Sequence, residues 1–123
     1  MTQALIVDAS EYWASELKAQ LAVLGVETLS WQNKGSGWIE GLSKSSANWV
    51  FVDDQLSSRS GIKCIEKIFE SRSFEGNVVF MHSVQGPAAD AIEAAAYNWG
   101  AHFILRKPFR TAELRKILDQ ARS

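Results

Sequence analysis

Short apolar runs alternate along the chain with longer segments in which apolar residues recur at helical spacing. The runs predict five strands, at residues 4–7, 26–31, 49–52, 78–81 and 102–105. The other segments predict five helices: one capped by Ser10, a short one at 38–42, then 62–69, 88–99 and a last one capped by Thr111. Strands and helices are therefore expected to alternate from one end of the chain to the other.

The predicted strands are apolar throughout, and Trp49-Val50-Phe51-Val52 is the clearest example. Such strands are typical of a parallel sheet that helices cover on both faces, with right-handed crossovers between the strands. We therefore predict an α/β fold, a flavodoxin-like doubly wound sandwich with a five-stranded parallel sheet and five helices. A length of 123 residues predicts one domain, 1–123, without an attached output domain.

Charge and hydropathy argue against a nucleic-acid-binding protein, a membrane protein and a secreted protein. The 13 basic and 14 acidic residues are mixed along the sequence and leave a net charge of -1, which disfavours direct binding to nucleic acid. No stretch approaches the roughly 20 apolar residues of a membrane span, and the first residues show no signal-peptide pattern. The cytoplasm is the expected location.

Cysteine and tryptophan bear mainly on packing. Cys64 is the single cysteine, so an internal disulfide is excluded and a buried small side chain is expected. Four of the five tryptophans are expected to pack helices onto the sheet: Trp13, Trp31, Trp38 and Trp49. Trp99, near the end of the helix at 88–99, is the candidate for a partner surface.

Three charged residues stand where predicted strands end: Asp8, Asp53 and Lys107. The carboxyl ends of parallel strands share one edge of the sheet, where open α/β folds bind ligands, so these groups would converge on one phosphate-binding site. Strand alternation turns Asp54 away from Asp53, which favours Asp53 as the reactive carboxylate. Lys107 could hold a phosphoryl group as a mobile positive charge or form a structural salt bridge with either aspartate.

Four segments, taken in order, resemble the response regulator receiver domain of two-component signalling. They are Leu5-Ile6-Val7-Asp8, Val50-Phe51-Val52-Asp53, Gly61, and the stretch from Gly100-Ala101 to Lys107-Pro108-Phe109. The resemblance spans essentially the whole chain. It implies that Asp53 accepts a phosphoryl group from a histidine of a kinase or a phosphotransfer protein, and that Lys107 contacts that group.

The sequence departs from the receiver pattern where chemistry is expected. Receivers usually have two acidic residues after the first strand, whereas here Ala9 takes the second position. The threonine or serine that contacts the phosphoryl group corresponds to His82 or to Ser83. His82 could be a polar residue that borders the pocket, or a donor that acts when its imidazole is protonated. The aromatic residue of the fifth strand corresponds to Ile104, with Phe103 on the opposite face.

The resemblance also implies a magnesium ion, held by the carboxylates of Asp8 and Asp53 and by the backbone carbonyl of Gln55. The missing carboxylate at Ala9 predicts weakened binding, because a water molecule would have to replace that ligand. Glu11 is a nearby acid, although it is better suited to supporting the first turn of its helix.

We expect a single-domain relay or adaptor in a histidine-to-aspartate phosphorelay, whose protein binding changes when Asp53 is phosphorylated. By resemblance, the expected surface for a downstream protein is the fourth helix, fifth strand and fifth helix. No enzymatic activity is expected beyond self-catalysed phosphoryl transfer to Asp53 and its hydrolysis. Self-association into a homodimer is left open.

Three alternatives compete with this prediction. A pseudo-receiver would use the same fold as an interaction module that does not depend on phosphorylation, and Ala9, His82 and Ile104 favour it. An aspartate-nucleophile phosphatase would require a D-x-D pattern, where this chain has Asp53-Asp54-Gln55. A flavodoxin-type cofactor protein would require a phosphate-cradling loop after the first strand, which Ala9-Ser10-Glu11 does not provide.

Overall fold

The computed structural model describes residues 2–32, 37–56, 60–72 and 74–122. The elements follow in the order β1 (Gln3–Val7), α1 (Glu11–Val23), β2 (Glu27–Gln32), η1 (Gly37–Ile39), η2 (Leu42–Lys44), β3 (Trp49–Asp53), α2 (Gly61–Ser71), β4 (Asn77–His82), α3 (Pro87–Asn98), β5 (Phe103–Arg106) and α4 (Thr111–Arg122), where η marks a 3-10 helix. All five predicted strands are present, and each begins and ends within one residue of its predicted bounds.

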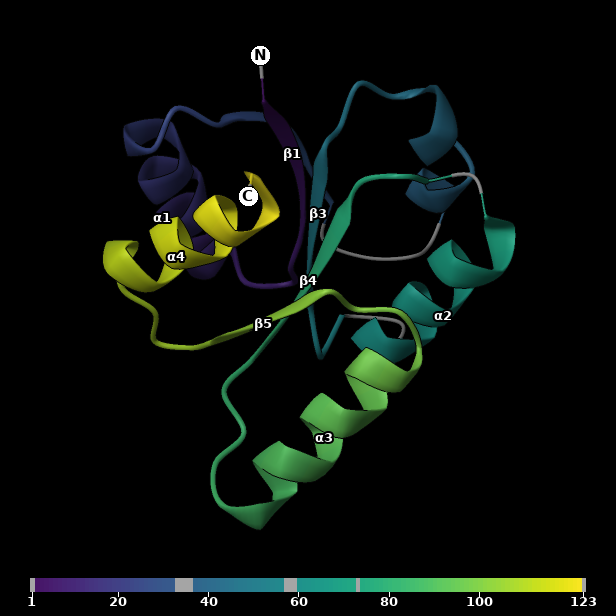
Figure 1. Ribbon diagram of the computed structural model, residues 1–123, viewed down its shortest axis with the longest axis vertical. Helices are drawn as coiled ribbons and strands as arrows, with labels where there is room; N and C mark the ends of the chain where they lie inside the picture. Colours follow the sequence, from purple (N-terminus) through teal and green to yellow (C-terminus); the bar gives the residue numbers. More distant parts are fainter. Residues whose placement is uncertain (1, 33–36, 57–59, 73, 123) are drawn as a thin grey trace.

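The strands form one parallel sheet in the order β2-β1-β3-β4-β5. α1 and α4 cover one face of the sheet, and α2 and α3 cover the other (Figure 1). This is the flavodoxin-like doubly wound arrangement, so the predicted fold class is confirmed. The strand order reverses between β1 and β3, and such a reversal opens a crevice at the carboxyl ends of the strands.

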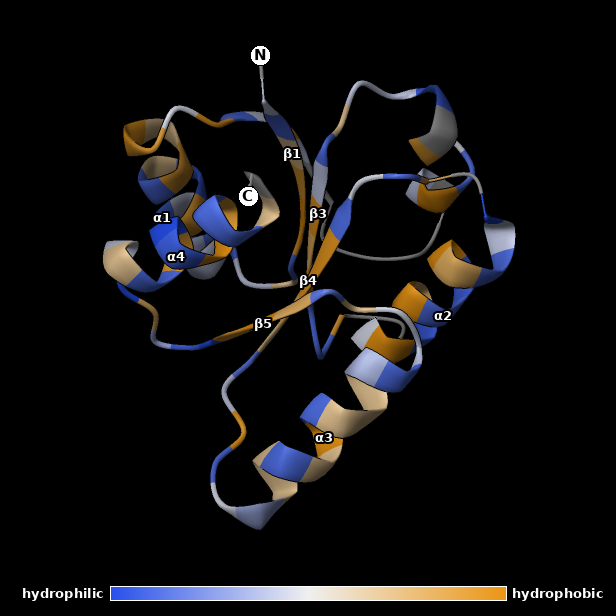
Figure 2. Cartoon of the chain, in the orientation of Figure 1, coloured by the Kyte–Doolittle hydropathy of each residue, from blue (hydrophilic) through white to orange (hydrophobic). Residues whose placement is uncertain are grey.

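Two apolar layers, one on each face of the sheet, explain why the strands are apolar throughout. In β1, Ala4 and Ile6 pack in the layer under α1 and α4, whereas Leu5 and Val7 pack in the layer under α2 and α3. Every residue of β3 is buried. Figure 2 shows these hydrophobic strands between helices along which hydrophilic and hydrophobic residues alternate. The central strand therefore presents its last residue, Asp53, from a fixed position.

Side-chain hydrogen bonds to the backbone stabilise the first turns of α1 and α4. The Ser10 hydroxyl accepts the backbone N–H of Trp13 at 3.2 Å, so the predicted cap of α1 is confirmed. Thr111 does not precede α4 but is its first residue, so this predicted cap is wrong by one position. Arg110 stands before the helix, and its backbone N–H donates to the Glu113 carboxylate at 3.2 Å.

The predicted helix at 38–42 is not formed. Two short 3-10 helices, η1 and η2, stand on either side of Glu40 and Gly41 instead. A five-residue segment containing a glycine is too short to offset the cost of helix nucleation, whereas a 3-10 turn fixes fewer residues. Ile39 and Leu42 are nevertheless buried in the layer under α2, so the segment still covers the sheet. In the described residues the count is four α-helices and two 3-10 helices.

Cysteine and most tryptophans pack as predicted. Cys64 and Trp49 are buried in the two apolar layers, and Trp38 packs against the layer under α2 while partly exposed. Trp99 is 36% exposed just after α3. The side chain of Trp31 lies outside the described part of the chain.

Gly61 explains why the spacing from Asp53 to the next helix matters. It begins α2, and its backbone N–H donates to the Asp54 carbonyl at 2.8 Å. A Cβ atom at this position would lie 1.8 Å from the carbonyl oxygen of Asp53 and 2.8 Å from its carbonyl carbon. Only glycine allows the start of α2 to approach the end of β3 this closely.

We expect Gly61→Ala to lower the free energy of unfolding by about 2 kcal/mol or more, because rigid backbone must move to admit the methyl group. Urea denaturation of the full chain measures this loss. Gly41→Ala is the matched control: its Cβ would meet nothing closer than 3.9 Å, so a change within about 0.5 kcal/mol is expected. Equal losses in the two variants would contradict the prediction.

Candidate functional site

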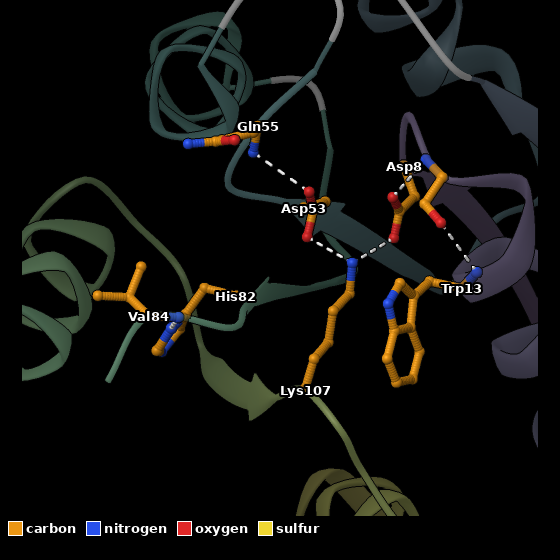
Figure 3. A network of polar contacts seen from close by, with 8 residues as sticks. Asp8, Trp13, Asp53, Gln55, His82, Val84 and Lys107 are labelled. Atoms are coloured by element: carbon orange, nitrogen blue, oxygen red, sulfur yellow. Dashed lines mark hydrogen bonds and ion pairs between the residues drawn. The ribbon is translucent and has the colours of Figure 1, made fainter. Parts of the chain in front are cut away.

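Three charged side chains meet at the crevice between β1, β3 and β5 (Figure 3). Asp8 directly follows β1, Asp53 ends β3, and Lys107 directly follows β5. The Lys107 Nζ atom donates to Asp8 Oδ2 at 2.7 Å and to Asp53 Oδ1 at 2.6 Å. The structure therefore brings together the three residues that the sequence singled out, although they are separated by up to 99 positions.

The second oxygen of each aspartate binds the backbone of its own loop. Asp8 Oδ1 accepts the N–H of Ser10 at 2.9 Å, and Asp53 Oδ2 accepts the N–H of Gln55 at 3.2 Å. Both bonds span two residues, a common turn pattern for aspartate. Each carboxylate is thus oriented on one side by the loop and on the other by the Lys107 ammonium.

Burial makes this cluster electrostatically unusual. The side chains of Asp8, Asp53 and Lys107 are 2%, 11% and 5% exposed, respectively. Burial raises the pKa of Asp8 and of Asp53 above their ordinary values, and it outweighs the opposing hydrogen bond from Lys107. One lysine faces two carboxylates, so these three groups carry a net charge of about -1 when all of them are ionised.

A cavity of about 360 Å³ opens above these groups. Its lining consists of Asp8, Ala9, Ser10, Trp13, Asp53, Asp54, Gln55, Ser83, Val84 and Lys107. Ala9 is exposed at the cavity, so no second acid follows β1 here. Glu11 lines a different cavity, between α1 and β2, and does not replace the missing carboxylate.

Ser83 and His82 lie on opposite sides of the end of β4. Ser83 lines the cavity beside Asp53, whereas His82 is fully buried and does not line it. The His82 Nε2 atom lies 2.6 Å from Glu93 Oε2 on α3, and its Nδ1 atom accepts the N–H of Val84 at 3.0 Å. Figure 3 shows the ring turned toward Val84 and away from Lys107. His82 is therefore placed neither as a pocket residue nor as a protonated donor to a phosphoryl group.

β5 places Phe103 and Ile104 on opposite faces of the sheet, as the strand alternation predicts. The Phe103 ring lies 5.9 Å from the Trp49 ring, centroid to centroid, in the layer under α1 and α4. Ile104 packs against the layer under α2 and α3. Ile104 therefore places an aliphatic side chain on the face that α3 covers, at the position where receivers usually have an aromatic one.

Trp13 is a site residue that we assigned only to the core. It lines the cavity, and its ring centroid lies 5.5 Å from Lys107 Nζ and 5.5 Å from the Phe109 ring. A cation near an indole face is attracted by the ring electrons. Its place five residues after Asp8, in the first turn of α1, was the sequence signal that could have indicated this role.

The donor atoms present suit a hard divalent cation. Mg²⁺ in proteins is commonly bound by one or two carboxylates, with water and substrate phosphate oxygens completing its shell. Asp8 and Asp53 supply two such carboxylates in one cavity. Among the described residues no group of three histidine, cysteine, aspartate or glutamate side chains could hold a metal ion.

The structure is a doubly wound α/β fold with two aspartates and a lysine in contact at the carboxyl edge of its sheet. The chain belongs to the response regulator receiver domain family, whose sequence model matches residues 4–119. Proteins of this family act in two-component signalling, generally bind Mg²⁺ at the acidic pocket, and interact with histidine kinases or phosphotransfer proteins. In the described residues no helix is long and apolar enough to cross a membrane.

Solved structures share this fold. A CheY-like receiver domain protein from Methanospirillum hungatei has a TM-score of 0.81 at 19% identity, covering 98% of this chain and 93% of that one. The chemotaxis protein CheY4 from Vibrio cholerae has a TM-score of 0.82 at 18% identity, covering 98% of each chain. A response regulator structure from Chloroflexus aurantiacus has a TM-score of 0.84 at 20% identity, covering 97% and 95%. The comparison with curated proteins gave no match.

Replacing Lys107 by methionine should leave two buried carboxylates without their shared cation. We expect the free energy of unfolding at neutral pH to fall by about 3–5 kcal/mol. Without the ammonium, the pKa of each aspartate should rise further above its unfolded value. Stability from such a group is present at low pH and is lost as the pH rises through the folded-state pKa. The deficit should therefore shrink when urea denaturation is repeated at acidic pH.

Lys63→Met is the matched control for this measurement. Lys63 is 70% exposed and lies 3.7 Å from Glu66, so its loss should change the free energy of unfolding by about 0.5 kcal/mol or less. A Lys107→Met deficit that stays constant or grows toward acidic pH would show that the buried carboxylates are not its cause.

Proposed function

We propose that this chain is a phosphoacceptor receiver in which Asp53 takes a phosphoryl group from a phosphohistidine, and that it acts as a relay or adaptor. The observation that carries the proposal is the bridge from Lys107 to both Asp8 and Asp53 inside one cavity. The donor would be a histidine kinase or a phosphotransfer protein. The expected surface for a downstream protein is formed by α3, β5 and α4.

The chemistry follows from the charges that the cavity holds. A carboxylate oxygen of Asp53 forms a bond to phosphorus while the phosphorus–nitrogen bond of the donor breaks, and the departing imidazole nitrogen takes up a proton. Both reactants are anionic, so catalysis consists mainly of alignment and charge neutralisation. Lys107 can neutralise phosphoryl oxygens from where it stands, because its ammonium already lies 2.6 Å from Asp53 Oδ1.

Ser83 is the proposed switch residue. It lines the same cavity as Asp53 and carries a hydroxyl that can donate to a phosphoryl oxygen. His82 is the poorer candidate for this role, because its ring contacts Glu93 and Val84 and does not line the cavity. The sequence left both residues open, and the position of Ser83 in the cavity supports our choice of Ser83.

The metal ligands in this proposal are the carboxylates of Asp8 and Asp53 and the backbone carbonyl of Gln55. When bound, magnesium would neutralise charge on the aspartates and on the phosphoryl oxygens. Binding is expected to be weak, because Ala9 supplies no third carboxylate and Lys107 already compensates part of the negative charge.

A pseudo-receiver remains the second candidate, and the aliphatic Ile104 favours it. Without an aromatic side chain on the α3-covered face of β5, the usual route from the acceptor to that surface is missing. This candidate predicts that partner binding is unchanged by Asp53→Asn. A phosphorylation-dependent affinity would exclude it.

Incubation with acetyl phosphate and Mg²⁺, followed by intact-mass measurement, tests the acceptor. We expect the wild type to gain the mass of one phosphoryl group and Asp53→Asn to gain none, because the amide is not a nucleophile for phosphorus. Asp54→Asn is the matched control, since Asp54 is the neighbouring carboxylate in the same cavity, and it should gain the group like the wild type.

A phosphorylated Asp53→Asn variant would place the acceptor elsewhere. If the wild type gains no mass from acetyl phosphate or from a phosphorylated histidine phosphotransfer protein, the proposal is refuted.

Restoring an acid at position 9 should strengthen magnesium binding. We expect Ala9→Asp to lower the Kd for Mg²⁺ by roughly tenfold, or about 1.4 kcal/mol, because it adds a third carboxylate at the exposed rim of the cavity. Isothermal titration calorimetry of the full chain measures this. Ala9→Asn, of the same shape without the charge, should bind like the wild type, and equal gains in both variants would point to an effect other than charge.

A further inference from the structure

His82 is a fully buried polar residue that the proposed phosphoryl chemistry does not use. It is the last residue of β4 and stands next to Ser83 in the chain. Its ring accepts the backbone N–H of Val84 at 3.0 Å, and its own carbonyl accepts the backbone N–H of Lys107 at 2.7 Å. One residue thus holds the loop that carries Ser83 and the backbone that carries Lys107.

The hydrogen bonds specify one form of the His82 ring. Nδ1 accepts an N–H, so this nitrogen carries no proton. Nε2 lies 2.6 Å from the Glu93 carboxylate, which can only accept, so Nε2 carries the proton and donates. The two ring nitrogens therefore have different roles: Nδ1 accepts from the Val84 backbone and Nε2 donates to Glu93.

Glu93 connects this buried ring to the surface. It extends from α3, and it receives Arg106 Nε at 2.6 Å and Arg106 Nη2 at 2.9 Å from the end of β5. Arg106, chiefly through this hydrogen bond, lowers the pKa of Glu93, so the acid remains charged at neutral pH. The Arg106 side chain is 59% exposed, and its contact to Asp90 is longer, at 3.8 Å. The pair formed by Arg106 and Glu93 is called the clamp below.

These contacts form a continuous path from the site to the surface of α3 and β5. Ser83 lies in the cavity, Val84 follows it, and the Val84 N–H binds His82, which binds the clamp. If Ser83 moves toward a phosphoryl group on Asp53, the Val84 N–H must move with it. A buried ring nitrogen that loses its donor is unfavourable, so the ring has to follow and change its contact with Glu93.

We propose that His82 is a positioning residue for Ser83, and that it transmits the phosphorylated state of Asp53 to the clamp on α3 and β5. The polar path takes the place of the aromatic side chain that Ile104 does not provide. This inference rests on the proposed function and adds the route by which the site changes its surface. In the unmodified protein, the Arg106–Glu93 pair and the hydrogen bond from the Val84 N–H to His82 stabilise each other, because both fix the position of the His82 ring.

The first arm of the test uses the unmodified full chain and needs no phosphorylation. Nitrogen-15 NMR should show the His82 ring with its proton on Nε2. Glu93→Gln should disturb this signature and speed hydrogen exchange of the Val84 amide by about tenfold or more, because the ring loses its charged partner. Asp90→Asn, which removes only the weaker and exposed partner of Arg106, should leave both signals as in the wild type.

Arg106→Gln removes the other partner of the clamp, and the substituted side chain is exposed. This variant should also speed hydrogen exchange of the Val84 amide. This second variant tests the path if Glu93→Gln fails to fold, as judged by circular dichroism. An unprotonated Nε2 in the wild type, or Val84 exchange that neither variant changes, would overturn the proposal.

The second arm adds Mg²⁺ and beryllium trifluoride, which mimics a phosphoryl group on a carboxylate. The Gln55 amide reports whether Asp53 is loaded. In the wild type we expect the signals of Gln55, Ser83 and Arg106 Nε all to shift. In Glu93→Gln, Gln55 and Ser83 should still shift while Arg106 Nε no longer responds.

The outcomes distinguish the two proposals. A wild type in which Gln55 and Ser83 shift but Arg106 Nε does not would refute the path while leaving the acceptor role of Asp53 standing. The path is likewise refuted if Arg106 Nε responds equally in Glu93→Gln. If Gln55 itself does not shift and the mass measurement shows no phosphoryl gain, the acceptor role fails, and the transmission proposal fails with it.

Discussion

One buried ammonium shared by two buried carboxylates is the interaction on which the site depends. Lys107 reaches Asp8 and Asp53 from the opposite end of the sequence, and this contact is possible only because β1, β3 and β5 are parallel and end at one edge. The cluster is held together but not fully neutralised, since burial keeps the pKa of both acids raised. Burying three charged side chains together is favourable only because they are paired, and raised pKa values are a frequent feature of functional sites.

The last residues of β4 and the residue that follows them lie in different surroundings. Successive side chains of a strand point to opposite faces, so Met81 packs under α1 and α4 while His82 lies under α3. Ser83, just beyond the last ladder contact, then lies in the cavity. The loop that carries Ser83 is thereby bound to His82 through the Val84 N–H, and His82 in turn contacts Glu93 on α3. These two contacts connect the crevice to α3.

The sequence predicted the sheet and the three charged residues well, because both follow from apolar runs and from the residues that end them. It could not choose between His82 and Ser83, since that choice depends on where β4 leaves the sheet. It overestimated the helix at 38–42, where Gly41 and the shortness of the segment favoured 3-10 turns. The partnership of His82 with Glu93 was also invisible, because it joins residues on different elements with no fixed spacing.

The indole of Trp13 has a consequence for how this protein can be observed. Its ring lies 5.5 Å from the Lys107 ammonium and borders the cavity directly. The electronic state of an indole responds to a nearby charge, so any displacement of that ammonium should alter the emission of this residue. The fluorescence of Trp13 can therefore report on the charged cluster of Asp8, Asp53 and Lys107 without an attached dye.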